Sequence, residues 1–226
     1  CYNNIGLAYH HKGDFSKALD YYHKALNIQE AIHDDRGSGY SLSNIGYLFY
    51  NQGEHDKAIE YFRKSLILRT RINDLHGLAF SLLNLGYTYA EKGKTDSALL
   101  YFHKSLDIRQ KIGDLTGVSY ALNQIATQKQ KMGDMKGALE DFNRSRKMQE
   151  EIGDLSGLTG TLQSIGALYY YQNDAIRAIE YGKKSMEVAR KINYPNDIKN
   201  AAMLLKNAYK KAGKSKESLE MFELYI

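Results

Sequence analysis

The sequence predicts an all-α solenoid of antiparallel helix pairs, and three observations lead to this fold class. Similar segments recur every 40 residues without a gap, as NNIGLAYHHKG at 3–13, SNIGYLFYNQG at 43–53 and LNLGYTYAEKG at 83–93. Each copy spaces its apolar residues with the period of a helix. The chain has only one proline, Pro195, in 226 residues. A fixed period between about 20 and 50 residues is typical of a solenoid.

The repeat at 37–76 illustrates the two helices that we expect in each unit. Leu42, Ile45 and Phe49 form the apolar stripe of a first helix, which ends at Gly53. A glycine just past a helix supplies the left-handed residue that closes it. The second helix has its own stripe, formed by Ala58, Ile59, Phe62, Leu66 and Ile72.

Aspartates and glycines mark the joints between repeats. Asp74, Asp114 and Asp154 stand where a first helix is expected to begin. A carboxylate at that position can accept hydrogen bonds from the free N–H groups of the first turn. Gly113 and Gly153 directly precede two of these aspartates and are suited to end the preceding helix.

Gly86 lies inside a predicted first helix, where glycine costs about 1 kcal/mol relative to alanine. Gly6, Gly46 and Gly166 hold the same place in other repeats, and Ala126 is the mildest substitute. We predict that the missing side chain allows close packing against the second helix, at the small residue Ala98.

Pairs of opposite charge follow the outer surface of the second helices. An acidic residue precedes a basic one by four positions in Asp20–Lys24, Glu60–Lys64, Glu140–Arg144 and Glu180–Lys184. This spacing supports an exposed helix by roughly 0.2–0.5 kcal/mol per pair. We therefore interpret this surface as a solvated face.

We predict one repeat domain over residues 1–226, with about twelve helices. Its repeats span approximately 1–36, 37–76, 77–116, 117–156, 157–196 and 197–226. Cys1 falls inside a repeat unit and no initiator methionine precedes it, so we expect a fragment of a longer protein.

Bulk composition narrows the possible partners. The net charge of +5 is a mild bias, far from a nucleic-acid footprint. Nucleic-acid binding is an alternative that we do not favour. It rests on a basic cluster formed by Lys206, Lys210, Lys211, Lys214 and Lys216. No apolar run approaches the roughly 18 residues of a membrane span. The single cysteine excludes an internal disulfide framework; the compartment stays open, with the cytoplasm favoured.

Motifs for catalysis or cofactor binding are missing from the sequence. The seven histidines form no HExxH pattern and do not pair with a cysteine at zinc-ligand spacing. The glycines recur once per repeat and form no phosphate-binding loop. We therefore predict no catalytic residues, no metal site, no cofactor and no enzymatic activity.

The repeated residues resemble the tetratricopeptide repeat (TPR), and the resemblance covers the whole chain. In the third repeat the matching positions are Leu82, Leu85, Gly86, Tyr89, Ala98, Phe102 and Ser105. The resemblance implies a right-handed TPR solenoid whose first helices line a concave groove. Leucine in place of the usual tryptophan, the lack of a helix-ending proline and six extra residues per repeat are departures from the common pattern.

The 40-residue length and the IGDLTG and IGDLSG linkers are similar to a narrower subgroup. That subgroup includes the spindle adaptor LGN and bacterial regulators in which the repeats precede a kinase, cyclase or DNA-binding domain. LGN-like repeats often carry a basic residue after the linker aspartate. Leu75, Leu115 and Leu155 stand there instead, and only Arg36 keeps the charge.

Aromatic residues fall into two sets. Tyr21, Tyr61, Tyr101 and Tyr181 share one place on the second helices, and we expect a packing role. On the first helices, rows of aromatics lie off the core stripe and are expected to face the groove: Tyr40, Phe80 and Tyr120, Tyr47 and Tyr87, and Tyr50 and Tyr170. Exposed aromatics with a polar tip are typical of binding surfaces. Packing between neighbouring first helices is the alternative.

Amide side chains form a further row on the same helices. Asn44 and Asn84 align with Gln124, and Asn123 is its neighbour. The family resemblance implies that asparagines here can hold the main chain of a bound peptide, since an amide both donates and accepts. A local bond between helices is the alternative. The chaperone-tail clamp of some relatives is missing, because Ser43 and Tyr47 occupy its positions.

We therefore predict a non-enzymatic protein- or peptide-binding scaffold. Its groove comprises Tyr40, Asn44, Tyr47, Phe80, Asn84, Tyr87, Tyr120, Asn123 and Gln124. The alternative is a regulatory sensor module of a larger bacterial signalling protein, such as a histidine kinase, cyclase or DNA-binding regulator. Self-association through a terminal repeat is a further possibility.

Overall fold

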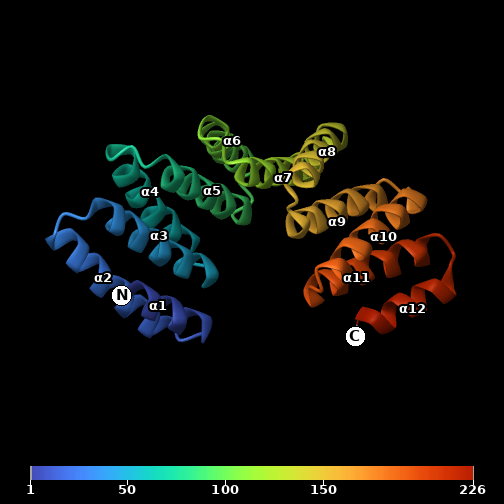
Figure 1. Cartoon of the computed structure of the whole chain (residues 1–226), viewed down its shortest axis with the longest axis horizontal. Coiled ribbons are helices and arrows are strands. Elements are labelled where there is room, and N and C mark those ends of the chain that lie inside the picture. The colour runs from blue at the N-terminus through green and yellow to red at the C-terminus, as the bar shows by residue number, and fades with distance from the viewer. Residues whose placement is uncertain (1, 226) are drawn as a thin grey trace. The chain divides into compact units, whose positions relative to one another are not determined.

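The computed structural model describes residues 2–225 and confirms the all-α fold, with twelve helices in that part of the chain (Figure 1). The helices are α1 (Tyr2–His11), α2 (Phe15–Ala31), α3 (Asp35–Asn51), α4 (His55–Arg71), α5 (Leu75–Glu91), α6 (Thr95–Lys111), α7 (Leu115–Lys131), α8 (Met135–Ile152), α9 (Leu155–Tyr171), α10 (Ala175–Lys191), α11 (Pro195–Lys211) and α12 (Ser215–Tyr225). Each odd-numbered helix packs against the even-numbered helix that follows it.

The chain divides between Asp114 and Leu115 into two compact units of three helix pairs each. The first unit holds α1 to α6, and the second holds α7 to α12. The handedness of the superhelix stays a prediction. Among the described helices, none has the length and apolarity needed to cross a membrane.

Each unit has apolar cores between its helices. In the first unit, Tyr22, Ile45 and Phe62 are fully buried together. In the second unit, Phe142 and Ile165 occupy one cluster. A further cluster joins α10 to α11 through Met186, Ala201, Ala202, Leu205 and Tyr209. The apolar stripes predicted from the sequence therefore form the cores.

The predicted caps at Asp74 and Asp154 are present. Oδ1 of Asp74 accepts from the backbone N–H of Gly77 at 3.1 Å, and Asp154 does the same for Gly157 at 2.9 Å. Gly53, Gly113 and Gly153 have φ between 71° and 75°, as expected for residues that end a helix.

The partner of Gly86 differs from the prediction. A Cβ on Gly86 would meet the ring of Phe102, and Gly46 has the same relation to Phe62 at 2.8 Å. The nearest group is therefore a ring of the second helix, not the methyl group of Ala98. A glycine lets this ring lie flat against the first helix, and the packing gained offsets the lost helix propensity.

The tyrosines on the second helices have the predicted packing role. Tyr21, Tyr61, Tyr101 and Tyr181 each stack on a ring of the first helix, with centroids 5.3–5.6 Å apart. In the fourth repeat an ion pair replaces the rings. Nζ of Lys129 lies 2.6 Å from Oδ2 of Asp141, in the positions that hold Tyr89 and Tyr101 one repeat earlier.

Three of the four predicted charge pairs form on the second helices. Lys24 contacts Asp20 at 2.7 Å, and the pairs Glu60–Lys64 and Glu180–Lys184 behave alike. Arg144 instead contacts Asp141, at 3.1 Å, so the predicted pairing with Glu140 was wrong. The buried carboxylate of Asp141 draws the guanidinium because it lies three residues away on the same helix.

Candidate peptide-binding surface

The exposed side of α3 and α5 forms the first-helix face of the first unit. Tyr40, Tyr47 and Phe80 lie on it and are 46–50% exposed. Three of the predicted groove residues are therefore available for binding in this unit.

Two predicted residues of this face lie deeper. Asn84 is only 7% exposed, and its Nδ2 has no hydrogen-bond partner among the described residues. Tyr87 is half-buried, with its ring edge-on to Phe102 at 5.4 Å. Sequence reasoning set Tyr87 apart from the helix-pair packing. That expectation was wrong, because its ring packs against the core phenylalanine of α6.

Tyr47 belongs to a cluster of rings that joins α1 to α3. Its ring lies 5.7 Å from His10 and 6.1 Å from Tyr50. Nδ2 of Asn51 lies 2.9 Å from Nε2 of His10. Partial burial and the neighbouring His11 lower the pKa of His10. This end of the face therefore carries a neutral imidazole at neutral pH.

Asn44 of α3 is partly buried. The second unit brings the last three predicted residues together. Tyr120, Asn123 and Gln124 on α7 line one pocket of about 440 Å³, which we call the polar pocket. Tyr120 is 47% exposed. The other lining residues come from α7, α8, α9 and the turn before α9: Thr127, Gln149, Asp154, Ser156, Gly157, Gly160, Thr161 and Ser164.

Hydrogen bonds fix the floor of the polar pocket. Nδ2 of Asn123 donates to Oγ of Ser145 at 2.8 Å and to Oγ1 of Thr161 at 2.6 Å. Oγ1 of Thr161 donates to Oε1 of the buried Gln149 at 2.7 Å. Oδ1 of Asn123 is buried without a partner among the described residues. The donor side of this amide therefore serves the fold.

Gly160 explains why the pocket opens at this place. It holds the position that Tyr40, Phe80 and Tyr120 hold in the three preceding repeats. A Cβ built on Gly160 would have no atom within 4 Å. Sequence reasoning missed this residue, although the gap in the aromatic row was a readable signal.

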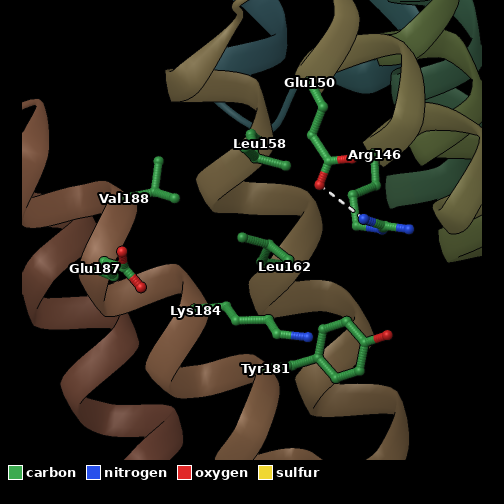
Figure 2. A pocket seen from close by; sticks show the side chains of 8 residues that line it. All are labelled: Arg146, Glu150, Leu158, Leu162, Tyr181, Lys184, Glu187 and Val188. Atoms are coloured by element: carbon green, nitrogen blue, oxygen red, sulfur yellow. Dashed lines mark hydrogen bonds and ion pairs between the residues drawn. The ribbon is translucent and has the colours of Figure 1, made fainter.

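A second pocket lies between α8, α9 and α10 and contains none of the predicted groove residues. Figure 2 shows its lining, in which Leu158 and Leu162 lie between the charged side chains of α8 and α10. Arg146 binds Glu150 with 2.7 Å between Nη1 and Oε1. Arg146 stands where Leu66 and Leu106 stand in earlier repeats. The exchange of an apolar side chain for a charged one accompanies this opening.

Metal-binding clusters do not occur in the part of the chain that the structure describes. No three histidine, cysteine, aspartate or glutamate side chains gather there in a way that would hold an ion. The chemistry of both first-helix faces is therefore that of rings, amides, hydroxyls and a few carboxylates.

The repeated antiparallel helix pairs define an α-helical repeat protein. The tetratricopeptide repeat family model matches residues 1–66, 37–111 and 117–191, and the chain belongs to that family. Domains of this family are typically non-catalytic and generally bind proteins or peptides. Among curated proteins, no sequence matches the chain.

Solved structures share the fold at low sequence identity. BtubC from P. vanneervenii is 17% identical with a TM-score of 0.81, and the match covers 92% of this chain and 88% of BtubC. A Rap protein complexed with competence and sporulation factor is 13% identical with a TM-score of 0.74, over 99% and 72% of the two chains. A signal transduction ATPase with a tetratricopeptide repeat sensor, from Pyrococcus horikoshii, is 17% identical with a TM-score of 0.80, over 99% and 35%.

Proposed function

We propose that this chain is a non-enzymatic scaffold that binds a protein or peptide ligand on its first-helix faces. One observation carries the proposal: Tyr40, Phe80 and Tyr120 recur at one repeat position and are each about half exposed. Aromatic side chains bury a large area at a low cost in conformational entropy, and they dominate binding energy at many interfaces.

The amide side chains supply the polar half of the proposed surface. Asn84 has a donor and Asn123 an acceptor without a partner among the described residues. Buried polar groups in folded proteins are normally satisfied, so such groups beside exposed rings favour a ligand with its own backbone donors and acceptors. Asn44, Tyr47, Tyr87 and Gln124 complete the proposed set.

Within the family, we place the chain in the 40-residue subgroup that includes LGN and bacterial regulators. A regulatory sensor module is the second candidate function. The ATPase from Pyrococcus horikoshii supports it, because that protein carries a tetratricopeptide repeat sensor on the same fold. The two candidates share the ligand-binding step and differ in what binding controls.

A peptide-array screen with parent and variant proteins tests the proposal. The Tyr40→Ala/Phe80→Ala/Tyr120→Ala variant should lose most hits, because three exposed rings are removed. Ile67→Ala is the matched control, since Ile67 is an exposed apolar residue on the second helix α4. Hits that survive the triple variant and disappear with Ile67→Ala would move the site to the second helices.

A further inference from the structure

The ends of three second helices differ at one position that faces the next repeat. Arg69, Arg109 and Gln149 stand 40 residues apart, five residues before Asp74, Asp114 and Asp154. Nη1 of Arg69 lies 3.2 Å from Oδ2 of Asp74, and Arg109 pairs with Asp114 in the same way. Two of these aspartates therefore have an arginine within the chain.

Asp154 has no such partner. Its Oδ1 accepts from the backbone N–H of Gly157 at 2.9 Å, and among the described residues no basic side chain pairs with it. Gln149 reaches the same place with a neutral amide, because its Nε2 would lie 2.7 Å from a Cβ on Gly157. At the equivalent Gly77, the guanidinium of Arg69 occupies the space that a Cβ would take.

The polar pocket lies over this carboxylate and is otherwise uncharged. Asp154 is the one charged residue of its lining. The side chains of Gln124 and Ser164 add hydrogen-bond acceptors. The half-exposed ring of Tyr120 offers a flat surface on which a guanidinium can stack.

We propose that the polar pocket binds an arginine side chain of the ligand, which supplies the guanidinium that Gln149 does not. Arginine fits better than lysine, because its planar fork presents five N–H donors to a carboxylate and several acceptors at once. Gly160 provides the entrance, since an aromatic side chain at this position would cover the pocket. The inference rests on the proposed function and names one side chain of its ligand.

The test uses Nα-acetyl-arginine amide as the probe, with the citrulline and lysine analogues as matched controls. Titration is followed by the ¹⁵N chemical shifts of the Gly157 and Gly160 amides. We expect saturable shifts with the arginine probe. Citrulline keeps the shape of arginine and loses its charge, so its affinity should be at least roughly tenfold lower. Equal binding of arginine and citrulline, or no shift with either, overturns the inference.

Two variants restore arrangements that the chain already uses elsewhere. Gln149→Arg should form an internal pair with Asp154, and Gly160→Tyr should cover the pocket; each should abolish the shifts while the protein stays folded. Arginine binding that survives Gln149→Arg in a folded protein contradicts the inference.

Array peptides that need Tyr120 but contain no arginine also contradict it and leave the proposed function standing. If the arginine probe binds but the array peptides bind the aromatic variants as well as the parent, the proposed function is refuted instead.

Discussion

Nη1 of Arg69 lies 3.2 Å from Oδ2 of Asp74, inside the joint between the second and third repeats. Arg69 is 6% exposed, and burial lowers its pKa although Asp74 acts in the opposite direction. The same joint between the fourth and fifth repeats has Gln149 and the polar pocket. Two exchanges thus separate the self-paired joint from the open one: glutamine replaces Arg69 at position 149, and glycine replaces Phe80 at position 160.

The self-paired joint should depend on both partners. Arg69→Ala should destabilise the protein by about 3–5 kcal/mol, because it leaves a largely buried carboxylate with only the exposed Arg36, 4.0 Å away, as a cation. Arg69→Gln should cost less, since glutamine fills this position in two other repeats. Urea unfolding of the two variants measures the difference. Equal stabilities would show that the charge pair is unimportant.

The ion pair of Lys129 and Asp141 should be replaceable by rings. Asp141→Ala should cost about 1–3 kcal/mol, because the ammonium then lacks its buried partner. The double variant Lys129→Tyr/Asp141→Tyr should recover much of this loss, since four other repeats stack two rings at these positions. Urea midpoints of the parent, single and double variants test this. A double variant less stable than Asp141→Ala would refute the equivalence.

Gly86 should tolerate alanine better than leucine. Leucine would force the ring of Phe102 away and should cost about 1–3 kcal/mol by overpacking. Alanine requires a smaller shift of the ring, and Ala126 already lies at this position against Phe142. Thermal unfolding of both variants distinguishes them. A leucine variant as stable as the parent would overturn the close-packing explanation.

Two glycines of α9 should respond in opposite directions. Gly160→Ala should stabilise the protein by about 0.5–1 kcal/mol, because the helix gains propensity and the Cβ meets open space. Gly157→Ala should destabilise it, because the Cβ would collide with the carboxylate of Asp154 that caps the helix. Denaturant unfolding of the two single variants gives the signs directly. Equal effects would contradict the finding that the space beside Gly160 is open and the space beside Gly157 is filled.

His10 should make part of the stability depend on pH. Its pKa is lowered in the folded protein from 6.5, first by burial and then by His11. The folded state therefore binds fewer protons, so this contribution is present above about pH 6.5 and is lost as the pH falls through the lowered pKa. Unfolding of the parent and of His10→Gln at pH 7.5 and pH 5 checks this. An equal loss in both proteins would exclude His10 as the cause.

The sequence predicted the fold through features that each repeat carries within itself. The helical stripe of Leu42, Ile45 and Phe49, the cap at Asp74 and the left-handed Gly53 need only local spacing, and all were confirmed. The exposure of Tyr40, Phe80 and Tyr120 followed in the same way, because these residues lie off the stripe. Local periodicity is a direct consequence of helix geometry, so it is readable without a structure.

The features that the sequence did not predict depend on contacts between helices, which the spacing of residues along the chain does not determine. Tyr87 lies off the apolar stripe of its helix, yet its ring packs against Phe102 on the next helix. The polar pocket needs Gln149, Asp154 and Gly160 from two successive repeats at once. Each of these residues is ordinary in its own helix, and only their combination in space leaves an opening.

The central claim is that the exposed aromatics of the first helices bind the ligand. The most direct measurement is calorimetric titration of one array-selected peptide against the parent, Tyr120→Ala and the control Ile67→Ala. Trimming Tyr120 should weaken binding by about 2 kcal/mol, roughly thirtyfold in Kd, while Ile67→Ala leaves it unchanged. An unchanged affinity for Tyr120→Ala, together with a loss for Ile67→Ala, would contradict the claim.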